Sequence, residues 1–166
     1  NVERESIRRE SMTIGEFHRN LQLKVKIFTP TPDLVPRVSQ MTQRTNQFNF
    51  TTKRRTESEI QRIVESEAIH CLVVEAEDRF GDYGLISVLL ACERGGALVI
   101  DTWLMSCRVL KRGVEHLLLN RVVAEARRRG LREVTGVYIP TPKNKLVQNH
   151  YADLGFHLGL YSLLVF

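Results

Sequence analysis

Three consecutive apolar runs constrain the fold of this chain more than any other feature. They are HCLVVEAED, LISVLLACE and ALVIDTWLM, at residues 70–78, 85–93 and 97–105. Each is rich in Val, Ile and Leu, and the turn sequences RFGDYG and RGG separate them. Short β-rich runs with tight connections predict three strands that pair in antiparallel order.

The segment before these runs predicts one strand and a first helix. Residues 21–28, LQLKVKIF, alternate between apolar and polar side chains, which indicates a half-buried strand. Apolar residues at helical spacing predict a helix over 34–44, with Asp33 as its cap. Residues 45–55, TNQFNFTTKRR, have no regular period and are predicted to form a loop.

Two further helices have clear signals. Residues 56–66 begin with Thr56 and Glu59 in the spacing of a capping box. A helix is also predicted from 114 to 129, where Gly130 ends it. Its expected buried stripe consists of Val114, Leu117, Leu118 and Val122.

The last part of the chain continues the alternation of strands and helices. A strand is predicted over 133–139, a helix over 145–155, and a terminal strand or hairpin over 156–166. Together these elements predict an α/β fold with a mixed, partly antiparallel sheet flanked by helices.

The composition indicates the class of protein but does not identify a binding partner. A chain of 166 residues, 43% hydrophobic and 26% charged, suits one soluble globular domain. The net charge of +5 is compatible with an anionic partner and equally with none. No aromatic platform or recognition-helix pattern supports nucleic-acid binding.

The cysteines and the apolar runs indicate a cytoplasmic protein. Cys71, Cys92 and Cys107 are odd in number and lack CxxC spacing, so neither a disulfide framework nor a structural metal site is expected. No apolar run approaches the roughly 18 residues of a membrane span, and no signal segment opens the chain. Membrane association is therefore not predicted.

A basic turn precedes the helix at 114–129. In CRVLKRGVEHLLLN, residues 107–120, three bases and Gly113 lie just before the first helical turn. Free amides at a helix N-terminus form a phosphate site, and a glycine permits close approach. The alternative is a solvated helix start that happens to be basic.

Two segments of the chain resemble the GNAT acyltransferases. The first is Arg108-x-x-Lys111-x-Gly113, similar to the loop that binds the pyrophosphate of coenzyme A. The second is Asn144-x-x-Val147-x-x-His150-Tyr151-x-x-x-Gly155-Phe156. The resemblance implies the GNAT fold and a coenzyme A or phosphopantetheine site. The implied site residues are Arg108, Val109, Leu110, Lys111, Arg112, Gly113, Val114 and Asn144.

One position departs from the GNAT pattern. Lys111 stands where the family usually has its first glycine. Its side chain narrows the approach to the backbone, although a lysine can also pair with a phosphate as a point charge.

A narrower resemblance is to the C-terminal GNAT-like half of FkbH-like proteins of polyketide biosynthesis. The runs TNQFNFTTKR, DRFGDYGLISV, IDTWLMSCRVLKRGVE and YIPTPKN carry it. It implies that the domain helps to load a glyceryl unit onto an acyl carrier protein through thioester acyl transfer. It also implies a preceding haloacid-dehalogenase-like module. No Asp-x-Asp occurs in this chain, so no phosphatase activity is expected here.

That resemblance suggests a domain division. Residues 1–20 are expected to be a linker or helical lead-in from the missing module, and residues 21–166 the GNAT-like domain. The first residue is Asn1 rather than Met, which favours a piece of a longer protein. The alternative function is a non-catalytic module that binds the carrier protein or its phosphopantetheine arm.

Three candidate residues each have two interpretations. Tyr151 corresponds to the GNAT tyrosine that protonates the departing thiolate, or it is a packing residue on Phe156. Cys107 is a thiolate nucleophile near a helix N-terminus, or a small buried residue. Asn144 binds ligand amides or caps the following helix.

Weaker candidates lie elsewhere. The polar side chains of Asn46, Gln47, Asn49, Thr51 and Thr52 suit a polyhydroxylated acyl group, or they stabilise their own loop. The basic triplets at residues 53–55 and 127–129 form solvated surfaces, or they are docking sites for an acidic carrier protein. His70 and Asp101 are possible bases with no paired spacing.

Overall fold

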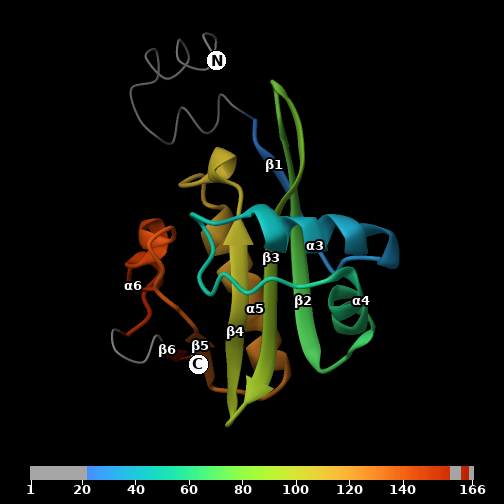
Figure 1. The fold of residues 1–166 in the computed structure, drawn as a ribbon. Helices are drawn as coiled ribbons and strands as arrows, with labels where there is room; N and C mark the ends of the chain where they lie inside the picture. The colour runs from blue at the N-terminus through green and yellow to red at the C-terminus, as the bar shows by residue number, and fades with distance from the viewer. Residues whose placement is uncertain (1–21, 158–161, 165–166) are drawn as a thin grey trace.

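Six strands form one sheet in which each strand lies beside its successor in the chain (Figure 1). The computed structural model describes residues 22–157 and 162–164, so the predictions for 1–20 lie outside the described residues. All neighbouring strands are antiparallel except β4 and β5, which are parallel. The strands are β1 Lys24–Phe28, β2 Ile69–Asp78, β3 Gly81–Arg94, β4 Ala97–Met105, β5 Glu133–Gly136 and β6 Ser162–Leu164.

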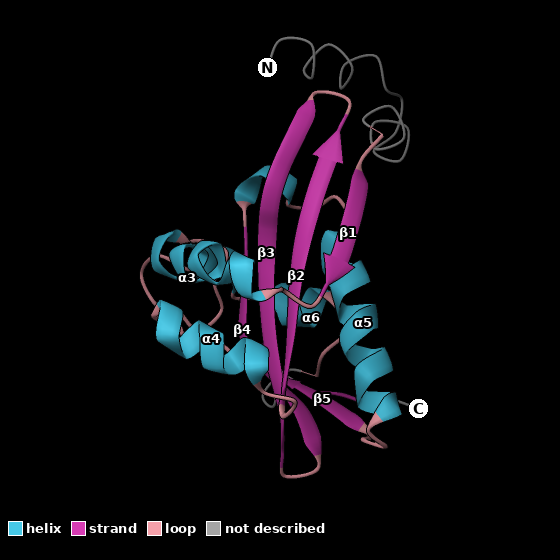
Figure 2. Cartoon of the chain, turned by 90° about the vertical axis from the view of Figure 1, so that its right-hand side faces the viewer, coloured by secondary structure: helices cyan, strands magenta, loops and turns pink. Residues whose placement is uncertain are grey.

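Helices cover both faces of the sheet (Figure 2). On one face lie α3, Val35–Arg44, and α4, Glu57–Glu65; on the other lies α5, Val114–Arg128. The short α6, His150–Asp153, also lies on the α5 side. Three 3-10 turns complete the order, η1 Pro32–Leu34, η2 Cys107–Val109 and η3 Lys145–Val147.

The core consists of two apolar clusters, one on each face. Side chains of a strand point alternately to opposite faces. In β3, Val88 and Leu90 pack in the cluster with α3 and α4, whereas Leu89 and Ala91 pack in the cluster with α5. The three central runs are therefore almost wholly apolar because both faces of their strands are covered.

Most predicted elements are confirmed, with shifted ends. The capping box of α4 is present: Thr56 Oγ1 accepts from the Glu59 amide, and the Glu59 carboxylate accepts from the Thr56 amide. The expected turn RFGDYG is shorter than predicted, because β3 already begins at Gly81. The helix predicted over 145–155 is divided into η3 and α6.

Two local predictions are wrong. Asp33 does not cap α3, because it lies inside η1 and the N-cap position falls on Leu34. Leu117 is 46% exposed rather than buried. The buried stripe of α5 instead continues through Leu119 and Ala126.

Candidate functional site

The two parallel strands at the centre of the site separate after a short paired stretch. β5 pairs with β4 only over Leu98–Ile100, although β4 continues to Met105. The register between β3 and β4 shifts immediately afterwards, which leaves Asp101 as the extra residue of a β-bulge. Bulges bend a strand and increase its twist. The bulge thus accounts for the divergence of β4 from β5.

Part of the segment predicted as a loop fills the widening gap. The Phe50 amide donates to the Trp103 carbonyl (3.1 Å), and the Met105 amide donates to the Phe48 carbonyl (3.0 Å). On the other side, the Ile139 amide donates to the Phe50 carbonyl (2.8 Å). Residues 48–50 therefore bridge the ends of the two separating strands.

Asn144 holds this bridging segment in place. Its side chain is fully buried. The Asn144 Nδ2 donates to the carbonyls of Asn49 (2.9 Å) and Ile139 (3.0 Å). Its Oδ1 accepts from the Thr141 amide (2.7 Å). Asn144 makes no side-chain cap to η3, so the expectation of a helix cap is wrong.

Tyr151 lies in an aromatic cluster around the same gap. Its ring centroid is 4.3 Å from that of Phe50 and 4.8 Å from that of Phe156. The ring also covers Gly136, where an added Cβ would lie 2.3 Å from the tyrosine Cζ. Burial raises the pKa of Tyr151 well above its ordinary value. The phenol therefore stays protonated at neutral pH, and the expected packing on Phe156 is confirmed.

The basic turn is partly occupied by the protein's own groups. The Val109 amide donates to the Ser106 carbonyl (3.3 Å), and the Leu110 amide donates to the Cys107 carbonyl (3.4 Å). The Lys111 amide donates to the carboxylate of Glu115 (2.9 Å), which is buried. Val109, Leu110 and Lys111 are among the implied site residues, but their amides are not open to an anion.

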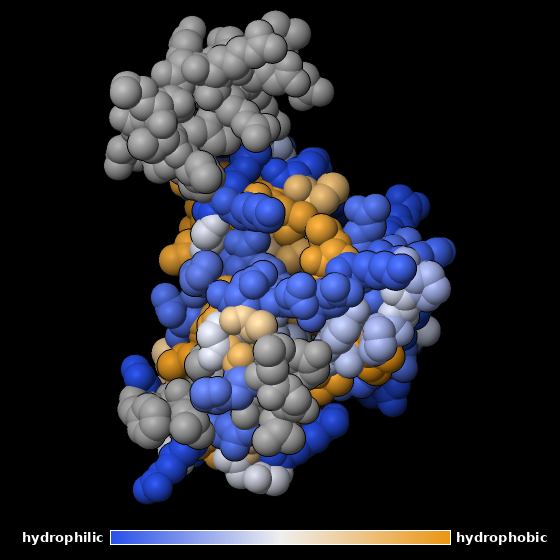
Figure 3. Space-filling model, turned by 90° about the vertical axis from the view of Figure 1, so that its left-hand side faces the viewer, coloured by the Kyte–Doolittle hydropathy of each residue, from blue (hydrophilic) through white to orange (hydrophobic). Residues whose placement is uncertain are grey.

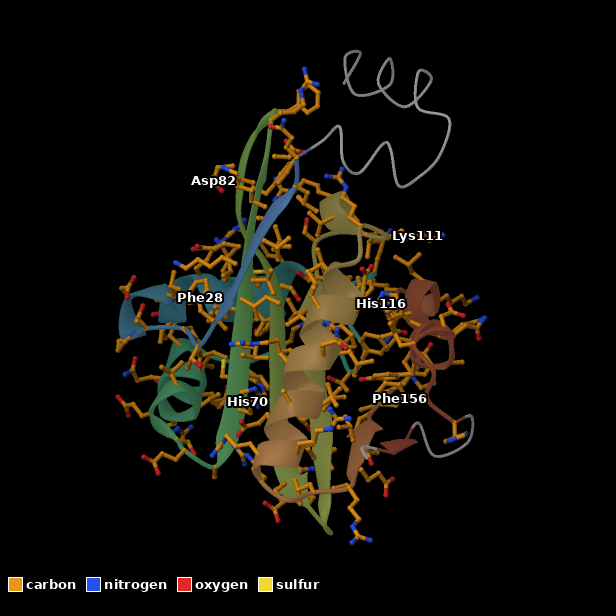
Figure 4. All side chains as sticks on the ribbon, turned by 180° about the vertical axis from the view of Figure 1, so that it is seen from behind. Phe28, His70, Asp82, Lys111, His116 and Phe156 are labelled. Atoms are coloured by element: carbon orange, nitrogen blue, oxygen red, sulfur yellow. The ribbon has the colours of Figure 1, made fainter. Side chains whose placement is uncertain are left out.

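The amides closest to the start of α5 remain available. Within the described residues, no acceptor is bonded to the amides of Arg112, Gly113 and Val114. Gly113 has a left-handed φ of 85°, and an added Cβ there would meet nothing within 4 Å. Figure 4 shows Lys111 beside the start of α5, where it projects away from the helix. The possible anion site is thus smaller than the sequence suggested, and it is open to solvent at Gly113, whereas Val114 is fully buried.

The arginines of the turn differ in their surroundings. Arg112 forms an ion pair with the buried Asp78 (3.4 Å). Arg108 Nε donates to Ser106 Oγ (3.2 Å), and its guanidinium lies 5.7 Å from the Tyr83 ring. Arg112 is therefore already neutralised by an acid, whereas Arg108 is not.

Cys107 is exposed at the start of η2, so the expectation of a small buried residue is wrong. It lines a groove of about 450 Å³ together with Asn46 and Gln47. Two other polar loop residues are buried and bond within the protein: Thr51 Oγ1 donates to the Asp101 carbonyl (3.0 Å), and Asn49 Oδ1 accepts from the Thr52 amide (2.9 Å).

The remaining candidates are engaged in ion pairs. Asp101 accepts from Lys53 and from Arg55 (2.6 Å), so the pKa of its carboxyl is lowered despite burial. A paired carboxylate of this kind is a weak base. The triplet 53–55 thus anchors the bridging segment instead of forming a solvated face.

Glu125 forms ion pairs with two arginines of the basic triplet at residues 127–129. It accepts from Arg128 (2.7 Å) and Arg129 (2.6 Å), and it lies 4.0 Å from His70. Hydrogen bonding from Arg128 is the largest cause that lowers the pKa of Glu125 to about 2. Burial lowers the pKa of His70, which favours its neutral form. His70 is therefore part of this cluster and not of the site around the turn.

The Glu125 cluster predicts an acid-sensitive contribution to stability. A carboxyl whose pKa is lower in the folded state stabilises the fold above its ordinary pKa of 4.5, and this contribution is lost as the pH falls toward 2. The difference in free energy of unfolding between the wild type and Glu125→Gln should therefore shrink between pH 5 and pH 2. Urea titrations at several pH values measure it, and a pH-independent difference would contradict the assignment.

The surface around the site is mixed in character. Leu117, Ile139 and Leu146 are large apolar side chains that remain exposed. Figure 3, which views the side of α6, shows an apolar area set among hydrophilic side chains. In the part of the chain that the structure describes, no helix could cross a membrane, and no cluster of three or more His, Cys, Asp or Glu residues could hold a metal ion.

Comparisons with known proteins identify the fold. No protein-family model and no curated protein matches the chain. A GNAT-family acetyltransferase from Streptococcus pneumoniae superposes with a TM-score of 0.61 at 15% identity, covering 86% of this chain and 100% of that one. The ribosomal-protein-S18-alanine N-acetyltransferase from Escherichia coli gives 0.58 at 13%, covering 81% and 78%.

A third solved structure contains a ligand. The PaiA N-acetyltransferase from Thermoplasma acidophilum, in complex with coenzyme A, gives a TM-score of 0.60 at 10% identity, covering 81% of this chain and 90% of that one. At sequence identities this low, the structural similarity shows the architecture alone. The chain therefore has the GNAT fold, a mixed and mainly antiparallel sheet flanked by helices.

Proposed function

We propose that this protein transfers an acyl group between thioesters, using the phosphopantetheine arm of coenzyme A or of an acyl carrier protein. The observation that carries the proposal is the start of α5, where no described group accepts from the amides of Arg112, Gly113 and Val114, and where Gly113 is exposed with open space around it. Such amides, at the positive end of a 15-residue helix, suit a phosphate group. The coenzyme A complex of a GNAT-fold neighbour supports this choice of ligand.

Two buried polar groups that pack against Phe48 and Phe50 suit the rest of the arm once residues 48–50 move aside. Trp103 Nε1 and His150 Nε2 are buried and have no hydrogen-bond partner among the described residues. Buried polar groups of this kind normally have one. The indole donor and the imidazole acceptor match the amides of a pantetheine chain, which carry both kinds of group.

A finer part of the proposal concerns the chemistry at Cys107. The exposed thiol, as thiolate, attacks the acyl carbonyl; the new carbon–sulfur bond forms as the donor's leaving group departs with the bond electrons. Cys107 is displaced as a thiolate when the carrier's thiol takes up the acyl group. Tyr151 is the candidate proton donor to a departing thiolate, which requires residues 48–50 to move, because its ring is buried beneath Phe50.

The acyl unit and the partners follow from the sequence resemblance. We propose a glyceryl-type acyl unit, an acyl carrier protein as acceptor, and a haloacid-dehalogenase-like module as the neighbour that prepares the donor. The polar residues Asn46 and Gln47, which share a groove with Cys107, support a hydroxylated acyl group.

A non-catalytic carrier-binding module is the second candidate. The bond between the Lys111 amide and the buried Glu115 carboxylate favours it. That carboxylate takes up one amide of the turn and opposes a pyrophosphate by charge repulsion. Sequence reasoning overlooked Glu115, although an acid in the first turn of a helix is a recognised signal.

Calorimetric titration with acetyl-coenzyme A and, separately, with phosphopantetheinylated carrier protein tests the proposal. We expect at least one ligand to bind, and Gly113→Asp to weaken binding at least tenfold by placing a carboxylate before the free amides. Gly130→Asp is the matched control, because Gly130 also has a left-handed φ and open space around it, at the far end of α5.

The outcomes separate the two candidates. Tight binding of acetyl-coenzyme A favours a standard acyltransferase. Carrier binding without coenzyme A binding favours the carrier-binding module. Failure of both ligands to bind, or equal effects of the two glycine substitutions, contradicts the proposed site.

A further inference from the structure

We propose that residues 48–50 form an autoinhibitory plug, which occupies the gap between β4 and β5 and must leave it before the phosphopantetheine arm can enter. The plug belongs to the segment between α3 and α4, so a part of the chain outside the sheet controls access to the gap. This inference rests on the proposed function, because the arm is the ligand that the plug excludes. The structure therefore shows the site in its closed state.

The backbone of the plug takes up hydrogen-bonding groups on the free edge of β4. The Trp103 carbonyl accepts from the Phe50 amide (3.1 Å), and the Met105 amide donates to the Phe48 carbonyl (3.0 Å). An extended ligand that carries amide donors and acceptors would bond to the same two groups, as an added strand does. The plug and the arm therefore compete for one edge of β4.

The aromatic side chains of the plug fill the same gap. The Phe50 ring stacks on Trp103, with centroids 5.4 Å apart, and its centroid lies 4.3 Å from that of Tyr151. The Phe48 ring meets His150 edge to face at 5.0 Å. Both phenylalanine side chains are buried. An acyl-bearing arm cannot reach Tyr151 while these rings stay in place.

Two polar atoms beside the plug favour a different occupant of the gap. Nε1 of Trp103 and Nε2 of His150 are buried and have no hydrogen-bond partner among the described residues. Polar atoms inside a permanent core are normally paired, because an unpaired one is unfavourable. A ligand that carries amides can pair with both atoms, whereas the phenylalanine rings of the plug cannot. The gap is therefore better suited to a polar ligand than to the plug.

The backbone just after the plug is strained in the closed state. Thr52 has a φ of 52°, a left-handed value that is unfavourable for a β-branched residue. Asn49 holds it there, because Asn49 Oδ1 accepts from the Thr52 amide (2.9 Å). Withdrawal of Asn49 with the plug would break this bond and release the strain. Asn144 opposes withdrawal, since its side chain donates to the Asn49 carbonyl (2.9 Å). The plug is thus held by specific bonds and opposed by local strain.

A reversible disulfide across the plug tests this inference. Asn49 lies opposite Leu104, and the two bonds that flank the pair make it an antiparallel pair of the non-hydrogen-bonded kind. The Cα atoms of such pairs are about 4.5 Å apart, which a disulfide can span. Asn49→Cys with Leu104→Cys should therefore lock the plug on β4 when oxidised. The Cys107→Ala background prevents pairing with the exposed Cys107, and peptide mass spectrometry identifies the bond.

Binding of acetyl-coenzyme A and of phosphopantetheinylated carrier protein is measured by calorimetry with and without reductant. For the ligand that the wild type binds, we expect oxidation of the lock to weaken binding at least tenfold and reduction to restore it, because only the open state is competent to bind. Lys24→Cys with Glu77→Cys, in the same background, is the matched control. This pair joins β1 to β2, which β3 separates from β4, so its oxidation should change the affinity less than twofold.

Amide hydrogen exchange in the wild type gives a second readout that needs no variant. A bound ligand ordinarily slows exchange around its site. Release of the plug should instead speed exchange at least tenfold in the peptide that contains residues 48–52, because the Phe50 amide loses its bond to Trp103. Peptides from α4 should exchange at the same rate with and without ligand.

The outcomes separate this inference from the proposed function. Equal affinities of the oxidised and reduced lock, or slower exchange at residues 48–52 on ligand binding, would overturn the plug, while the observed binding would uphold the proposed function. Equal losses in the lock and in the control pair would also overturn it. If the wild type binds neither ligand, the proposed function fails and the plug fails with it.

Discussion

Asn144→Ala is expected to lower the free energy of unfolding by about 3 kcal/mol. The side chain is fully buried and bonds to the backbone at Thr141, Ile139 and Asn49. Truncation would leave buried carbonyl groups without a donor, and an unsatisfied buried group costs about 1 to 3 kcal/mol. Equilibrium urea unfolding measures the loss.

Two further variants make this prediction specific. Asn149→Ala should change stability by less than about 0.5 kcal/mol, because Asn149 is exposed and makes no side-chain cap to α6. Asn144→Asp should be at least as damaging as alanine, since its carboxylate cannot donate to the carbonyls of Asn49 and Ile139. A loss below about 1 kcal/mol for Asn144→Ala would contradict its role in holding the bridging segment.

Gly136→Ala is expected to destabilise the protein by about 3 kcal/mol or more. The added Cβ would lie 2.3 Å from Cζ and 2.4 Å from Cε1 of the buried Tyr151 ring. The backbone of Gly136 does not have a positive φ, so alanine is compatible with the local conformation. The expected cost therefore comes from the ring contact alone. Urea unfolding again provides the measurement.

The Tyr151→Leu background tests that explanation. Once the ring is removed, Gly136→Ala should become neutral or stabilising by up to about 1 kcal/mol, because alanine restricts the unfolded chain more than glycine does. The sign of the effect should thus change between the two backgrounds. The same loss in both would show that the strain does not arise from Tyr151.

Local signals in the sequence predicted much of the fold. Runs of apolar residues predicted the three central strands, and the Thr56 capping box predicted the start of α4, because both depend on residues close together in the chain. The order of the elements and the match at Arg108 and Tyr151 were enough to indicate the GNAT fold. The structure places two of the candidate residues, Cys107 and Asn46, in the lining of the same groove.

The features that the sequence did not predict depend on contacts between residues far apart in the chain. Nothing periodic marks residues 48–50 as a bridge, because their partners Trp103 and Ile139 come much later in the chain. The pairing of Arg112 with Asp78 joins positions 34 residues apart. Asn144 looked like a helix cap because its local sequence favours one, whereas the fold places three carbonyl groups around its side chain.

Three arginines that line the groove beside Cys107 were missed for a related reason. Arg37 and Arg44 lie on α3, and Arg108 lies in the turn after β4. Each alone is an ordinary exposed base. Only the folded chain shows that the three share one groove and that no described acid compensates them.

Intact-protein mass spectrometry after incubation with a glyceryl thioester and a phosphopantetheinylated carrier protein tests the proposed acyl transfer most directly. The account predicts that this chain gains one glyceryl group, that Cys107→Ala abolishes the gain while Cys92→Ala preserves it, and that the group then appears on the carrier. No mass gain on either protein, or a gain that survives Cys107→Ala, would contradict it.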